Sequence, residues 1–251
     1  MSSSGLKIAC LTCRWALAYG EPIFSRVREV ADISVLEVKC IGRIDPSTII
    51  DIFTRGVDGV LLIGCAPSDC HFIEGGLNAE LTVSVLKKLL YLAGLQPERL
   101  QLFWALPLST SEVINAVLSF VEQVKKMGPI PVSDVKILQS LLASKSAVAG
   151  YRLRVLVGKK KELTEIGNVY GAKLRQEEFN LLLEDVIRSE FIRHKILLLA
   201  RAEPLSVKKL AESLNIDPSE ALRHVLSLCR KGLMALDHID GTTPLYRSLG
   251  V

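Results

Sequence analysis

The chain has 251 residues, of which 49% are hydrophobic and 23% charged, enough to bury the core of one large or two modest globular domains. No stretch of about eighteen apolar residues is free of charge, which argues against a membrane-spanning helix. The first residues lack the basic head and apolar run of a secretory signal, so we expect a cytoplasmic protein. The net charge of +4 lies in residues 151–251, where 17 Lys and Arg stand against 13 Asp and Glu. This bias is far weaker than the basic field of a dedicated nucleic-acid binder.

Three short apolar segments near the start of the chain have the composition of buried parallel strands. Each is rich in β-branched residues and ends next to a cysteine: Leu6–Thr12, Ile33–Lys39 and Gly59–Gly64. Helical patterns separate them. The first covers Pro22–Val30. The second covers Ser47–Arg55, with Asp45 as its N-cap, Pro46 in its first turn and Gly56 as its stop.

The alternation of strands and helices continues through the first half of the chain. Apolar residues at helical spacing predict a helix over Ala79–Ala93, which is followed by a strand over Arg99–Ala105 and a helix over Ser111–Lys126. This alternation predicts an α/β fold with a doubly wound parallel sheet of the flavodoxin-like kind. We expect this domain to occupy residues 1–130.

Residues 131–189 show a different pattern, which we interpret as a linking α/β segment. A helix is expected over Val132–Ala143 and another over Glu177–Ser189. Between them, alternating apolar residues predict strands over Arg152–Gly158 and Asn168–Leu174.

Residues 190–251 show the order of elements found in a winged helix. A helix over Glu190–Arg201 precedes a helix–turn–helix, and a β-hairpin ends the chain. The helix–turn–helix and hairpin cover Ser206–Leu214, Pro218–Lys231, Leu233–Asp237 and Pro244–Leu249. Winged helices bind either DNA or other proteins, and the fold alone does not decide between them.

The helix over 218–231 would be the DNA-reading element of such a domain. Its expected exposed residues are Ser219, Glu220, Arg223, His224, Ser227, Arg230 and Lys231. The arginines suit phosphate or base contacts. A glutamate near the amino end of the helix does not, so we interpret the domain as a protein-docking module.

The chain has six cysteines, and five of them lie in the first 70 residues. A reducing compartment disfavours disulfides, so clustered thiols there indicate a metal or redox site. Cys13, Cys40 and Cys65 each follow a predicted strand, and Cys70 comes five residues after Cys65. Because parallel strands end at one edge of a sheet, the four thiols are expected to converge. Four thiolates fit either an iron–sulfur cluster or structural zinc.

Positive and aromatic side chains accompany these cysteines. Arg14, Arg43 and His71 are sequence neighbours of three of them, which suits an anionic cluster and raises its reduction potential. Trp15 next to Cys13 is expected to shield the cluster from water, although plain packing would explain it equally well. His71 has the alternative of a solvated loop residue.

The two remaining cysteines are assigned structural roles. Cys10 and Cys13 have the spacing of a thioredoxin-like dithiol, but Cys10 falls inside the first predicted strand and is expected to face the core. Cys229 shares a helix face with apolar residues, so it is also expected in a core.

Four motifs stand out between about Lys7 and Pro129: Cys13–Trp15, Cys40–Pro46, Gly56–Leu61 and Gly64–Phe72. Together they resemble the delta-subunit family of methyl-viologen-reducing hydrogenase. The resemblance implies a flavodoxin-like fold with a two-iron, two-sulfur (2Fe–2S) cluster. It also implies electron transfer between a donor or acceptor oxidoreductase and a heterodisulfide-reductase-like flavin and iron–sulfur subunit.

The chain departs from the family pattern at the first motif. The family commonly has Cys-x-Trp-Cys, whereas this chain has Ala16 in place of the second cysteine. Four family cysteines remain, so the resemblance implies that Cys13, Cys40, Cys65 and Cys70 are the cluster ligands. Two further departures, at Glu74–Asn78 and Trp104–Pro107, concern the surface presented to partners.

Three functions are compatible with these patterns. The first is an electron-relay subunit that makes and breaks no bonds of a substrate. The second is an iron–sulfur redox sensor that binds DNA through the winged helix. The third is an interaction protein stabilised by zinc. Among these we favour the electron relay.

Overall fold

A computed structural model describes residues 5–16, 33–105 and 110–250. The chain divides into two units, residues 1–145 and 146–251, and each is treated by itself. The predicted boundaries at residues 130 and 189 stay a prediction. Within the described ranges, no helix combines the length and the apolar character needed to cross a bilayer.

The first unit is built on a four-stranded parallel sheet. Its strands are β1 (Ile8–Cys13), β2 (Ile33–Val38), β3 (Gly59–Cys65) and β4 (Leu100–Ala105), in the order β2-β1-β3-β4. Flavodoxin-like sheets have this order for their first four strands. All seven residues of β3 are buried, as expected of a parallel strand covered on both faces. The predicted parallel α/β architecture is therefore confirmed for this unit.

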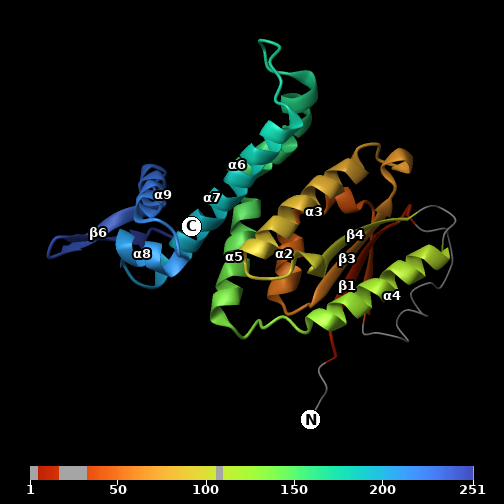
Figure 1. The fold of residues 1–251 in the computed structure, drawn as a ribbon, viewed down its shortest axis with the longest axis horizontal. Coiled ribbons are helices and arrows are strands. Elements are labelled where there is room, and N and C mark those ends of the chain that lie inside the picture. Colours follow the sequence, from red (N-terminus) through yellow and green to blue (C-terminus); the bar gives the residue numbers. More distant parts are fainter. Residues whose placement is uncertain (1–4, 17–32, 106–109, 251) are drawn as a thin grey trace. The chain divides into compact units, whose positions relative to one another are not determined.

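Helices lie on both sides of this sheet (Figure 1). Helices α2 (Pro46–Thr54) and α3 (Gly75–Leu92) are on one side and α4 (Thr110–Met127) is on the other, and α5 (Val135–Ala149) follows α4. The helix predicted over Pro22–Val30 lies outside the described residues.

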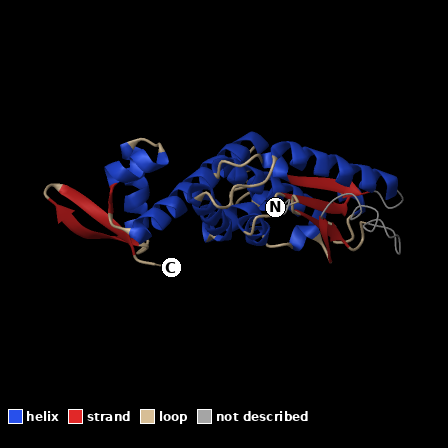
Figure 2. Cartoon of the chain, turned by 90° about the horizontal axis from the view of Figure 1, so that it is seen from below, coloured by secondary structure: helices blue, strands red, loops and turns tan. Residues whose placement is uncertain are grey.

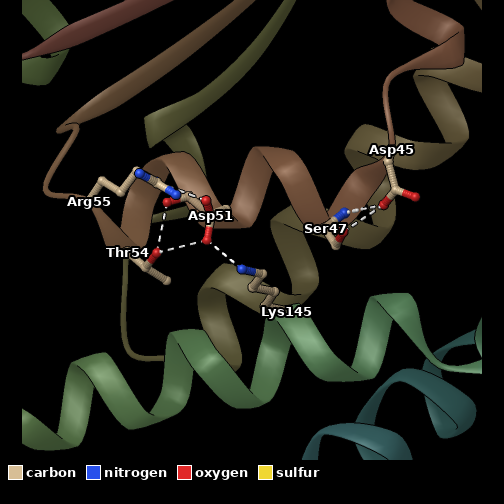
Figure 3. Close-up of polar contacts among 6 residues, drawn as sticks. All are labelled: Asp45, Ser47, Asp51, Thr54, Arg55 and Lys145. Carbon is tan, nitrogen blue, oxygen red and sulfur yellow. Dashed lines mark hydrogen bonds and ion pairs between the residues drawn. The ribbon is translucent and has the colours of Figure 1, made fainter.

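Helix α2 begins as its sequence predicts, with Asp45 as its N-cap (Figure 3). The Asp45 carboxylate caps it by accepting hydrogen bonds from the backbone N–H and the hydroxyl of Ser47, at 2.9 and 2.7 Å. One turn later Asp51 forms ion pairs with Lys145 of α5 and with Arg55. The Lys145 ammonium, followed by the Arg55 guanidinium, holds the pKa of Asp51 below its usual value.

A buried aspartate joins the beginning and the end of the sheet domain. The two carboxylate oxygens of Asp58 accept hydrogen bonds from the backbone N–H groups of Lys7 and Ile130, at 2.8 and 2.7 Å. The buried Arg99 donates to the carbonyl oxygens of Asp58 and Gly128, at 3.0 and 2.9 Å. The bond between Ile130 and Asp58 spans 72 residues of the sequence, and the bond between Lys7 and Asp58 spans 51.

The second unit contains a long helix, a helical pair and a small antiparallel sheet (Figure 2). Its helices are α6 (Tyr151–Gly158), α7 (Gln176–Ala202), α8 (Val207–Leu214) and α9 (Pro218–Arg230). Its strands are β5 (Leu205–Ser206), β6 (Met234–Asp240) and β7 (Thr243–Ser248), in the order β5-β7-β6. The assignment of this unit to the winged-helix class stays a prediction.

The two strands predicted before α7 are wrong. Residues 152–158 belong to α6, where only Leu153 is buried, so the alternating Leu153, Val155 and Val157 do not form one strand face. Residues 168–174 form a turn in which the Asn168 side chain accepts hydrogen bonds from the N–H groups of Tyr170 and Ala172. An asparagine that bonds its own following backbone favours a turn over a strand.

Two other predictions for this unit also need correction. The helices expected over 177–189 and 190–201 are one continuous helix, α7, because no glycine or proline interrupts the sequence there. On α9, His224 is buried rather than exposed, and Glu220 is half-buried and paired with Arg188 of α7. The predicted DNA-reading surface therefore loses two of its polar residues.

Candidate metal centre

Four thiols lie at the carboxyl edge of the parallel sheet. Cys13 is the last residue of β1, Cys65 is the last residue of β3, and Cys40 follows β2 after one intervening residue. Cys70 follows a short turn over Pro67–Asp69. The first three side chains are buried and Cys70 is half-buried.

The sulfur atoms form two pairs. The thiols of Cys13 and Cys65 are hydrogen-bonded to each other. The sulfurs of Cys40 and Cys70 both adjoin Gly75 at the start of α3: a Cβ atom built on this glycine would lie 2.7 Å from Cys40 Sγ and 3.2 Å from Cys70 Sγ. The two pairs also interact electrostatically. Cys40 helps to raise the pKa of Cys13, and Cys70 helps to raise the pKa of Cys65.

Backbone N–H groups point at these sulfurs. Ile41 donates to Cys13 Sγ at 3.1 Å, and the N–H of His71 donates to the Cys65 sulfur. Burial outweighs these donors, raising the pKa of Cys13 to about 12 and also raising that of Cys65. Both thiols are therefore protonated at neutral pH when no metal is bound. Metal binding has to release these protons.

Cys10 and Cys229 stand apart from this group. Cys10 lies inside β1, three residues before Cys13, so their side chains point to opposite faces of the sheet. Burial alone raises the pKa of Cys10 to about 12, with no contribution from another cysteine. Cys229 lies on α9 in the second unit.

Two glycines allow the segments that carry Cys40 and Cys70 to approach each other. A Cβ atom on Gly42 would lie 2.0 Å from the carbonyl oxygen of Gly75, so only glycine fits at position 42. The sequence predicted a helix only from Ala79 onward and assigned Gly75 no structural role, whereas Gly75 is buried in the first turn of α3. Its position five residues after Cys70 was the one available signal.

An aromatic stack lies next to the thiols. The rings of Trp15 and His71 are stacked, with centroids 3.9 Å apart and planes 16° from parallel. Phe72 packs edge-on against His71 at 5.0 Å. Trp15 follows Cys13 after one residue and His71 follows Cys70 directly, so the stack connects the segments after β1 and β3. Both rings remain partly exposed to solvent.

The segment between Cys70 and Gly75 contains a strained residue. Ile73 has a φ of 62°, an uncommon conformation that is especially unfavourable for a β-branched side chain. The N–H of Glu74 donates to the carbonyl oxygen of Phe72 across Ile73, closing a three-residue turn of the rare strained type. The Ile73 side chain is 81% exposed, so its own burial does not offset this strain.

The two arginines expected near the thiols are both on the surface. Arg14 forms an ion pair with Glu37 of β2 at 2.8 Å. Arg43 is the last residue of the turn over Ile41–Arg43 and is exposed. Their predicted influence on a bound cluster stays a prediction.

The thiols do not form a ready-made site for a single ion. In the described part of the chain, no group of three or more His, Cys, Asp or Glu side chains is arranged to hold one metal ion. The two sulfur pairs nevertheless offer four soft ligands within one edge of the sheet. Thiolates of this kind suit iron–sulfur clusters and zinc.

Residues 8–128 match the family model of the methyl-viologen-reducing hydrogenase delta subunit. An F420-non-reducing hydrogenase iron-sulfur subunit of Archaeoglobus profundus is 32% identical over 124 residues, which cover 49% of this chain and 90% of that protein. The vhc iron-sulfur subunit of the F420-non-reducing hydrogenase of Methanococcus voltae is 30% identical, over 51% of this chain and 90% of its own length. The chain belongs to this family. The matched residues include all four sheet-edge cysteines.

A much longer protein is also similar to this chain. It is a subunit of the ferredoxin/F420H2-dependent CoB-CoM heterodisulfide reductase of Methanosarcina acetivorans, and it is 30% identical over 125 residues. The chain spans only 16% of the length of that protein. The family model ends at Gly128, so it does not include the second unit.

The close approach at Gly75 leads to a prediction for the family's cysteine site. Gly75→Ala adds a methyl group between the sulfurs of Cys40 and Cys70, at distances shorter than ordinary contacts. We expect iron content after anaerobic reconstitution to fall by roughly tenfold, as for loss of a supporting residue at a metal site. Gly76→Ala is the matched control, because its methyl group would meet only Pro67, at 3.2 Å or more. Equal iron content in the two variants would contradict a role for Gly75.

Proposed function

We propose that this chain is an electron-transfer subunit that holds a 2Fe–2S cluster with Cys13, Cys40, Cys65 and Cys70. The observation that carries the proposal is the pairing of the four sulfurs, Cys13 with Cys65 and Cys40 with Cys70. Structural zinc requires four ligands around one ion. A 2Fe–2S cluster takes two ligands on each iron, so two adjacent pairs of thiols favour the cluster.

The surroundings of the thiols suit such a group. A 2Fe–2S cluster bound there would accept and release one electron at a time. The N–H groups of Ile41 and His71 would donate to its thiolates, and such hydrogen bonds raise a reduction potential. Trp15 and His71 would limit the access of water. Arg14 and Arg43 would add positive charge at the rim.

The names of the relatives support a place for this chain in a larger redox complex. One is an iron-sulfur subunit of a hydrogenase, and another belongs to a heterodisulfide reductase. We infer that this chain relays electrons between a donor or acceptor oxidoreductase and a heterodisulfide-reductase-like flavin and iron–sulfur subunit. The relay needs no catalytic residue of its own, and a cluster held by the sheet-edge thiols would be its point of electron exchange.

Spectroscopy of the anaerobically purified chain tests the cluster. We expect about two iron and two inorganic sulfide per chain, visible absorption in the oxidised form, and a paramagnetic resonance signal after reduction with dithionite. Zinc produces neither spectrum. Stoichiometric zinc without iron would refute the proposal and leave the zinc-stabilised interaction protein as the function of the first unit.

For the second unit we propose a winged-helix-like module that docks proteins. The support is the order α7, β5, α8, α9, β6 and β7, together with a net charge too small for a dedicated DNA binder. The alternative, a redox-sensing DNA-binding regulator, predicts binding to duplex DNA that weakens steeply with salt. A titration of labelled duplex at several salt concentrations separates the two.

A further inference from the structure

The solvent face of α9 is apolar and basic. Leu222 and Leu226, one turn apart, are 40% and 43% exposed, and Arg223 and Arg230 lie on the same side of the helix. The opposite side of α9 is buried in the unit through Ala221, His224, Val225 and Leu228. We call Leu222, Arg223, Leu226 and Arg230 the basic surface.

The stretch 176–185 of α7 has a solvent face that is apolar and acidic, and the exposed Arg188 that follows on the same side pairs with Glu220 of α9. Leu181 is 68% exposed and Leu182 is 39% exposed, while Phe179 and Leu183 on the other side are buried. Glu177 lies one turn before Leu181, and Asp185 lies one turn after it; both are exposed. We call Glu177, Leu181, Leu182 and Asp185 the acidic surface.

The two surfaces are both apolar and carry opposite charges. Both present two leucines to water, and covering them would remove apolar area from solvent. The basic surface has arginines where the acidic surface has carboxylates, and complementary charge of this kind selects a partner and fixes its register. Polar substitution of the leucines would leave either helix folded, since their buried sides hold them in place.

We propose that the acidic surface of one copy of this chain binds the basic surface of a second copy. Both surfaces belong to the second unit. We assign the pairing to a twofold axis, about which the contact is made twice and the assembly closes as a dimer. The proposal goes beyond electron transfer and does not depend on a bound cluster. It assigns the face of α9 that a DNA-binding winged helix would place in the groove to self-association.

The charges of the neighbouring hairpin also favour a protein over DNA. Strand β6 carries Asp237 and Asp240, and the one arginine of β7, Arg247, pairs with Asp237 at 2.8 Å. His238 also contacts the Asp237 carboxylate. A hairpin of this composition repels a phosphate backbone rather than neutralising it.

Sedimentation and light scattering of the full chain test the proposal. We expect a reversible dimer with a dissociation constant on the order of micromolar, weakened by added salt. The variant R223E/R230E and the variant E177K/D185K should each raise that constant by about tenfold or more, because like charges then face each other. Mixing the two variants should restore association as a heterodimer, since opposite charges again meet.

Two control variants test whether the loss of association is specific to the two surfaces. K208E/K209E changes two exposed residues of α8 by the same charge as R223E/R230E. E203K/E212K changes two exposed carboxylates outside the acidic surface by the same charge as E177K/D185K. Both controls should dimerise like the wild-type chain. Circular dichroism checks that all variants are folded. Cys13→Ser should dimerise normally, so loss of the cluster and loss of the dimer are separate outcomes.

Three results would overturn the proposal. The first is a wild-type chain that stays monomeric up to concentrations of roughly 100 μM. The second is a mixture of the two charge variants that fails to associate. The third is binding of labelled duplex DNA or of another protein that R223E/R230E abolishes while the wild-type chain shows no self-association. In that case the basic surface would bind DNA or another protein and not a second copy of this chain.

Discussion

Replacing any one of Cys13, Cys40, Cys65 or Cys70 with serine is expected to remove most of the iron from the anaerobically purified chain. Each cysteine belongs to one of two sulfur pairs, so in the proposed cluster its loss would leave one iron with a single protein thiolate. A serine hydroxyl is a much poorer ligand for iron than a thiolate. We expect iron content per chain to fall by about tenfold or more, as measured by metal analysis and visible absorption.

Cys10→Ser is the internal control for this series. Cys10 is as buried as Cys13 and lies on the same strand, but its side chain points to the other face of the sheet. The iron content of Cys10→Ser should equal that of the wild-type chain, although serine in an apolar core lowers folding stability by about 1–3 kcal/mol. Equal iron loss in Cys10→Ser and Cys13→Ser would show that the ligand set is wrong.

Asp58→Ala is expected to cause a large loss of folding stability in the first unit. It removes the acceptor for the N–H groups of Lys7 and Ile130 and deprives the buried Arg99 of its nearby negative charge. Buried donors left without partners cost about 1–3 kcal/mol each. We therefore expect the free energy of unfolding to fall by about 3–5 kcal/mol.

Urea unfolding followed by tryptophan fluorescence measures this effect. The only two tryptophans in the sequence, Trp15 and Trp104, lie in the first unit, so the signal reports that unit. Asp51→Ala is the matched control, because Asp51 forms ion pairs at the surface of α2, and such pairs contribute about 1 kcal/mol or less. A loss no larger for Asp58→Ala than for Asp51→Ala would contradict the proposed role of Asp58.

Periodicity and capping predicted the first unit well because both are local. Apolar segments of strand and helix length indicated β1, β3 and α4, and Asp45 with Pro46 marked the start of α2. The same local reasoning failed at α6. There the alternating apolar residues favour a strand, but the segment is a helix that buries only Leu153 against the rest of the unit. Local alternation does not determine which face a neighbour will cover.

The parallel sheet and the placement of three cysteines at one of its edges followed from the amino-acid sequence alone, since parallel strands all end on the same side. The folded chain was needed to show how the sulfurs pair, that Gly42 and Gly75 bring the segments of Cys40 and Cys70 together, and that Asp58 joins Lys7 to Ile130. These contacts depend on the packing of segments far apart in the chain. The sequence pattern of one segment contains no information on its distance from another segment.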